Sequence, residues 1–99
     1  MYSFYYENNY MNPYQQKWLE MLQKANLKGW TVKAVEDDIY IDMPHVTDLK
    51  LIKDNIPSTL GAMALDITVP KSRVRFIFHN GYETFDYILN PDSSDLNEG

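Results

Sequence analysis

Two histidines and a scatter of carboxylates are the residues of this 99-residue chain whose chemistry suits acid–base or nucleophilic catalysis. A nucleophilic site needs a base beside its nucleophile, and the histidines that can act as that base are His45 and His79. Neither lies in a recognisable motif, since His79 borders Asn80-Gly81 and His45 precedes an expected helix. Two isolated histidines without cysteine also make a poor set of metal ligands. We expect no catalytic residue, no metal site and no enzyme activity.

Phosphate- and calcium-binding loops are not indicated either. The four glycines, Gly29, Gly61, Gly81 and Gly99, are scattered, whereas loops that cradle phosphate need them closely spaced. The run at residues 36–38 is acidic, but it lacks the spaced ligands and the glycine of a calcium loop. Its residues suit a solvated turn. We therefore expect no cofactor.

Charge is segregated along the chain, whose net charge is −5. Residues 36–66 carry seven acids against Lys50 and Lys53, and residues 83–99 carry five acids and no base. An acidic surface favours association with a basic one, because complementary charge steers the encounter. The candidate residues for binding a basic partner protein are Glu36, Asp37, Asp38 and Asp42.

The N-terminal arm, residues 1–12, is unusually aromatic. Its only charged side chain is Glu7. Tyrosine is enriched in interfaces, and arms of this kind also exchange between the copies of a swapped dimer. Two alternatives stay open. The arm packs on the chain's own core, with a short strand over residues 2–6, or it assembles with a partner or a second copy. The aromatic candidates are Tyr2, Phe4, Tyr5, Tyr6 and Tyr10.

A basic segment offers another interpretation. Lys71, Arg73 and Arg75, followed by Phe76 and Phe78, superficially resemble a sheet that stacks single-stranded bases. In a strand, however, the arginines and the phenylalanines occupy opposite faces. The net acidity of the chain also disfavours phosphate binding. Weak single-stranded nucleic-acid binding is therefore kept as an alternative, and direct nucleic-acid binding is not the main expectation.

Residues 12–62 predict a helix, a hairpin and a second helix. Asn12 is the expected cap of the first helix, with Pro13 at its first position, and Gly29 ends it. Residues 31–35 and 39–43 read as two short strands of a hairpin. A helical period then begins near Thr47, a candidate cap, and Pro57 is expected to stop it after about ten residues.

The last part of the domain predicts a three-stranded meander. Residues 63–69 alternate as a half-buried strand does, and a second strand follows over residues 74–79. Asn80-Gly81 indicates a two-residue type I′ turn. The resulting register places Arg75 opposite Asp86 on the outer face. On the inner face it places Phe76 opposite Phe85 and Val74 opposite Tyr87.

The expected fold is therefore α+β, in the order α-β-β-α-β-β-β, with an antiparallel sheet of about five strands and both helices on one face. Residues 13–89 form the single domain, preceded by the arm, and residues 90–99 form an acidic flexible tail. The N-terminus lacks the features of a secretory signal, and no run of 18 apolar residues occurs. A cytoplasmic location follows, which is the host cell cytoplasm if the protein is viral.

These patterns together predict a non-enzymatic protein-binding module. A small acidic accessory or inhibitor protein, of a viral, mobile-element, immunity or antitoxin type, would engage a basic and often nucleic-acid-binding surface of another protein. The alternative is a structural protein that forms homo-oligomers, such as a homodimer, through its aromatic arm. No membrane partner is expected.

Overall fold

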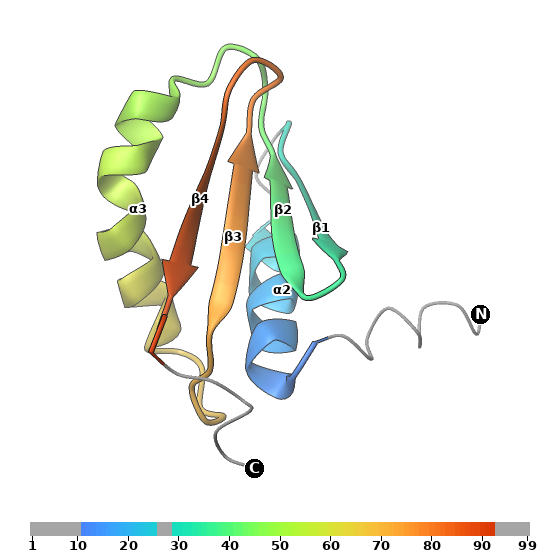
Figure 1. Cartoon of the computed structure of the whole chain (residues 1–99), viewed down its shortest axis with the longest axis vertical. Helices are drawn as coiled ribbons and strands as arrows, with labels where there is room; N and C mark the ends of the chain where they lie inside the picture. Colours follow the sequence, from blue (N-terminus) through green and yellow to red (C-terminus); the bar gives the residue numbers. More distant parts are fainter. Residues whose placement is uncertain (1–10, 26–28, 93–99) are drawn as a thin grey trace, which may run out of the picture.

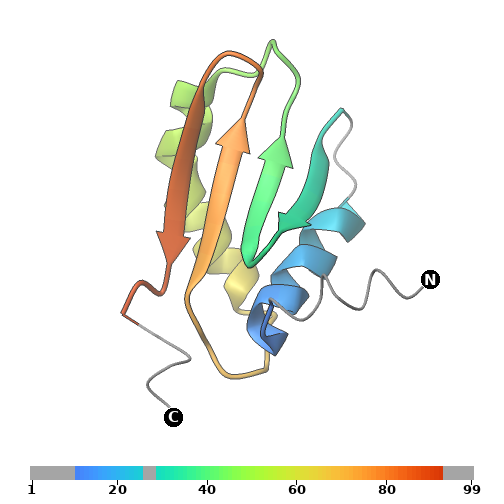
Figure 2. The same ribbon diagram turned by 45° about the vertical axis from the view of Figure 1, so that its right-hand side comes forward.

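A computed structural model describes residues 11–25 and 29–92, in the order α-β-β-α-β-β. The four strands form one mixed sheet in the order β1-β2-β3-β4 (Figure 1). Both helices lie on the same face of this sheet, behind the strands in Figure 2. The elements are α2 (Pro13–Ala25), β1 (Thr31–Val35), β2 (Asp38–Asp42), α3 (Leu49–Ala64), β3 (Val74–His79) and β4 (Thr84–Leu89).

The first helix begins where the sequence predicts. Asn12 Oδ1 accepts a hydrogen bond from the Gln15 backbone N–H at 2.9 Å, and Gln15 Oε1 accepts one from the Asn12 N–H at 2.9 Å. This reciprocal capping satisfies two of the N–H groups that a helix start leaves unpaired. Gly29 has φ +81°, but α2 is described to Ala25 and residues 26–28 lie outside the described residues, so the helix end predicted at Gly29 stays a prediction. The first helix and the β1–β2 hairpin are confirmed.

The second helix is longer than predicted, and this removes one strand. α3 runs through Pro57 to Ala64, and its N-cap is Asp48, not Thr47. The prediction of a strand over residues 63–69 was wrong, because Leu65 is 83% exposed instead of alternating with buried neighbours. Buried Ile56 and Leu60 lie on either side of the exposed Pro57. Their burial offsets the hydrogen bond that a proline cannot donate.

The sheet is mixed and not purely antiparallel, which corrects the expected topology. β2 and β3 pair in parallel at its centre, with Asp38 facing Arg75 and Asp42 facing His79. A parallel pair needs a crossover that returns the chain to the starting edge of the first strand, and a helix usually supplies it. A helix of 16 residues, as in α3, spans roughly 24 Å, enough to pass back along β2. The described residues thus contain four strands instead of about five.

The β3–β4 hairpin forms, but its register differs by two residues from the prediction. Arg75 faces Ile88, Phe76 faces Tyr87, and Phe78 faces Phe85. The reason is Asn80, whose Oδ1 accepts from the backbone N–H groups of Tyr82 and Glu83, both at 2.9 Å. These bonds favour a four-residue connection over a two-residue turn. Because the shift is even, each side chain keeps its predicted face.

The core lies between the helices and the inner face of the sheet. Trp18 of α2 and Phe76 of β3 are both 0% exposed, and their rings meet edge to face at 5.1 Å. Ile39, Ile41, Val74 and Phe78 extend this layer. None of the described helices is long and apolar enough to cross a membrane. The aromatic arm to Tyr10, the strand expected over residues 2–6 and tail residues 93–99 lie outside the described residues.

Candidate binding surfaces

The outer face of the sheet is a polar surface that no described helix covers (Figure 2). Strand pairing arranges its side chains in rows that run across β1 to β4. Three rows result, and together they contain acids, bases, a histidine and hydroxyls. The rows are Val35-Asp38-Arg75-Ile88, Lys33-Tyr40-Ile77-Asp86 and Thr31-Asp42-His79-Thr84.

Arg75 joins two strands across this face. Its Nε lies 3.1 Å from Asp86 Oδ2, and its Nη1 lies 3.4 Å from Asp38 Oδ2. The hydrogen bond to Asp86, followed by the charge of Asp38, raises the pKa of Arg75 above its ordinary value. The guanidinium is therefore already engaged by two carboxylates.

Asp38 remains in an unfavourable electrostatic environment despite this ion pair. Burial raises its pKa above the ordinary value, and the neighbouring Asp37 raises it further, while Arg75 acts in the opposite direction. Only 26% of its side chain is exposed. Since the carboxylate is desolvated and lies beside another acid, an additional cation there would be stabilising.

The four acids predicted to bind a partner do not form a single cluster. Glu36 and Asp37 are exposed at the β1–β2 turn, where Glu36 has φ 57°. Asp38 and Asp42 start and end β2, so a strand length of about 13 Å separates them. All four nevertheless border the outer face, and Asp86, predicted from the sequence only as the partner of Arg75, adds a fifth carboxylate.

Asp42, His79 and Thr84 form a row that outwardly resembles a catalytic triad. His79 Nδ1 lies 3.0 Å from Thr84 Oγ1, and its Nε2 lies 3.8 Å from Asp42 Oδ1. Strand pairing alone places these residues side by side. All three are solvent-accessible, with side-chain exposures of 39% for His79 and 50% for Asp42. His79 is close enough to act as a base for Thr84, but Asp42 lies beyond hydrogen-bond distance of the ring and the row is open to water, so it carries no argument for catalysis.

The residues considered for binding single-stranded nucleic acid do not share one surface. Arg75 is bound to acids, whereas Phe76 and Phe78 are buried in the core. Lys71 and Arg73 are exposed in the segment that precedes β3. The structure therefore does not bring these phenylalanines to the face that carries Arg75. No group of three or more His, Cys, Asp or Glu side chains suited to a metal ion occurs within residues 11–25 and 29–92.

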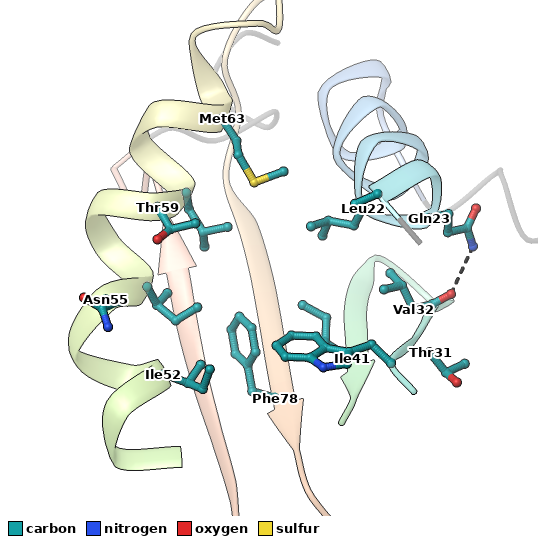
Figure 3. Close-up of a pocket in the computed structure, with 14 residues that line it drawn as sticks. Leu22, Gln23, Thr31, Val32, Ile41, Ile52, Asn55, Thr59, Met63 and Phe78 are labelled. Carbon is teal, nitrogen blue, oxygen red and sulfur yellow. Dashed lines mark hydrogen bonds between the residues drawn. The ribbon is translucent and has the colours of Figure 1, made fainter. Parts of the chain in front are cut away.

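An apolar groove opens on the other side of the sheet, between α2 and α3 (Figure 3). It has a volume of about 530 Å³, within the range of small binding sites. Leu22 of α2 and Met63 of α3 approach it from opposite sides, with Ile41 and Phe78 on the strands between them. None of the lining residues is charged. They are Leu22, Gln23, Ala25, Trp30, Thr31, Val32, Ile41, Ile52, Asn55, Ile56, Thr59, Leu60, Met63 and Phe78.

Sequence reasoning missed this groove. Its apolar residues read as ordinary core positions of two helices and two strands, because periodicity shows which side of an element is apolar but not what covers it. No local motif identifies a gap between two helices. A signal for the row Asp42-His79-Thr84 does exist in the sequence, because the two-residue period of a strand places His79 on the same face as Arg75.

The geometry defines a two-layer α+β protein with an acidic outer sheet face and an apolar groove between its helices. Comparison of the chain with family models, with curated proteins and with solved structures found no match.

Proposed function

We propose that the chain is a non-enzymatic protein-binding module whose outer sheet face and β1–β2 turn engage a basic surface of a partner protein. The observation that carries the proposal is Asp38, a partly buried carboxylate, 26% exposed, whose pKa is raised by burial and by Asp37 although Arg75 is bound to it. A cation supplied by a partner would relieve this cost. Small acidic inhibitor or accessory proteins, of the viral, mobile-element, immunity or antitoxin type, act in this way on basic and often nucleic-acid-binding targets.

The distribution of charge supports the same surface. The five carboxylates at this face are accompanied by Lys33, Arg75 and Arg73, whose charge also acts on Asp38, and Arg75 is shared between two of the carboxylates. Glu36 and Asp37 remain exposed, with no ion pair among the described residues. Exposed carboxylates of this kind accelerate encounters with a basic partner more than they strengthen the final complex.

The test compares two double variants with the same change in net charge. Glu36→Gln with Asp37→Asn removes two acids from the turn, and Asp54→Asn with Asp66→Asn removes two exposed acids from α3 and the segment after it. Partners captured from the native host by each form are quantified by mass spectrometry. Their association rates are then measured by stopped flow over a salt series.

The expected result is a basic partner that is captured by the wild type and by the α3-side variant, and that associates severalfold more slowly with the turn variant. Wild-type association should also slow as salt rises, since charges separated by more than roughly 8 Å are screened at physiological ionic strength. Rates that are insensitive to both salt and the turn substitutions would overturn the proposal.

A further inference from the structure

The groove between α2 and α3 leaves apolar side chains of both helices without a covering layer among the described residues. A surface of this kind marks a binding site when something of matching chemistry is available to cover it. We infer that the groove is the docking site for the chain's own N-terminal segment, residues 1–10. This inference concerns the helix side of the sheet and is independent of the proposed function of the outer face.

The chemistry of the segment matches that of the groove. Half of residues 1–10 are aromatic, and Glu7 is their only charged side chain. The groove has no charged lining residue, and it combines apolar surface with the amide and hydroxyl groups of Gln23, Asn55 and Thr59. Aromatic rings bury large areas in such grooves, and a tyrosine hydroxyl can remain hydrogen-bonded at the edge.

The tether length also fits. The described chain begins at Met11, whose side chain is 6% exposed and whose carbonyl accepts a hydrogen bond from Gln16 Nε2 at 3.1 Å. The groove begins at Leu22, nine residues after Pro13, the first residue of α2, which corresponds to a rise of roughly 14 Å along the helix. Ten extended residues reach roughly 33 Å. The segment is therefore long enough to run back along α2 and enter the groove beside α3.

The attachment makes an intramolecular occupant favourable. A short tether gives the segment an effective concentration near the groove in the millimolar range. A separate molecule of equal affinity would need a higher concentration than this to displace it. Because the N-terminal end of α2 is capped by Asn12 and Gln15, the starting point of the segment is well defined. Docking would cover Leu22, Ile52 and Met63. The conformational entropy lost would be that of ordering residues 1–10 alone.

Nuclear Overhauser contacts in the isotope-labelled full-length protein test the inference. Ring protons of Tyr2, Phe4, Tyr5, Tyr6 and Tyr10 should show contacts to methyl groups of Ile52, Ile56 and Met63. A sample that mixes labelled and unlabelled copies distinguishes contacts within a chain from contacts between chains. Contacts within one chain support the inference.

A matched pair of variants locates the site on α3. Thr59 lines the groove and is exposed, so Thr59→Glu introduces a charge into an uncharged site and should abolish the contacts. Ser58 is the adjacent exposed residue and does not line the groove, so Ser58→Glu should leave the contacts unchanged. Circular dichroism checks that both variants are folded.

Three results would overturn the inference. Ring protons of residues 1–10 that show only contacts within the segment would mean that it does not dock. Contacts found only between chains would assign the groove to a second copy. Contacts to methyl groups outside the groove, in place of those of Ile52, Ile56 and Met63, would put the segment elsewhere. None of these results depends on the acidic face or on a partner, so they are distinguishable from failure of the proposed function.

Discussion

Arg75 donates a hydrogen bond from Nε to Asp86 Oδ2 at 3.1 Å, although strand pairing places Ile88, not Asp86, directly opposite it. The contact is diagonal, because the β3–β4 connection has four residues instead of the two expected from Asn80-Gly81. Arginine is long enough to reach a diagonal neighbour, so the predicted ion pair survives a register that differs by two residues. The same side chain also reaches Asp38 on β2.

Truncating Phe76 should strongly destabilise the fold. Its ring is 0% exposed and packs edge to face on Trp18, so Phe76→Ala should lower the free energy of unfolding by ~3 to 5 kcal/mol. Val46 is 91% exposed, so Val46→Ala should change the free energy of unfolding by no more than ~0.5 kcal/mol. Urea unfolding of both variants measures the contrast. Similar losses for the two substitutions would contradict the assigned core.

Adding a methyl group at two glycines should have opposite effects. Gly81 has φ +94°, and a Cβ there would collide with the His45 ring, so Gly81→Ala should cost ~1 to 3 kcal/mol. Gly61 lies within α3 with open space around its Cβ position, so Gly61→Ala should stabilise by up to ~1 kcal/mol. Thermal and urea unfolding measure both effects.

The collision at Gly81 can be separated from its backbone strain. In a His45→Ala background the ring is absent, and the additional cost of Gly81→Ala should shrink to the part that reflects the positive φ. If the cost is the same in both backgrounds, His45 does not pack on this turn.

Asp38 should make the fold less stable as pH rises through the acidic range. Its pKa is raised above the ordinary 3.8, chiefly by burial, so the folded protein binds this proton more tightly than the unfolded chain does. The contribution of this proton to the free energy of unfolding is fully present below pH 3.8 and is lost as pH rises through the pKa of Asp38 in the folded state. Asp38→Asn removes this contribution.

Urea unfolding of wild type and Asp38→Asn from about pH 3 to about pH 6 checks the sign. The free energy of unfolding of the wild type, relative to the variant, should fall across this interval. A relative stability that rises with pH would mean that the Arg75 ion pair outweighs burial, and that the pKa of Asp38 is lowered.

The cap of α2 should contribute measurably to stability. Asn12 Oδ1 accepts from the Gln15 N–H, and Asn12 Nδ2 donates to Ser72 Oγ at 2.8 Å. Asn12→Ala should therefore cost ~1 to 2 kcal/mol, a drop of several degrees in melting temperature. Asn12→Asp keeps the acceptor and loses only the donor, so its loss should be smaller. Equal losses would show that the cap is not the source of the effect.

The sequence by itself determined those features that depend on neighbouring residues. The α2 cap at Asn12, the β1–β2 hairpin and the sidedness of β3 followed from local hydrogen bonding and from the two-residue period of a strand. The assignment of side chains to the two faces of β3 was correct even where the hairpin register was wrong, because a shift by two residues leaves each side chain on the same face. This is why Arg75 was assigned correctly to the face opposite Phe76.

Tertiary structure decided what local patterns leave ambiguous. Residues 63 and 64 fit both a strand and the end of a helix, and the packing of Ile56 and Leu60 carried α3 through Pro57 to Ala64. That longer helix returned the chain for a parallel β2–β3 pair, which no short-range signal distinguishes from an antiparallel one. The row Asp42-His79-Thr84 and the groove between α2 and α3 arise only from this pairing and this helix placement. Both bring together residues that are distant in the chain, so only the assembled fold could define them.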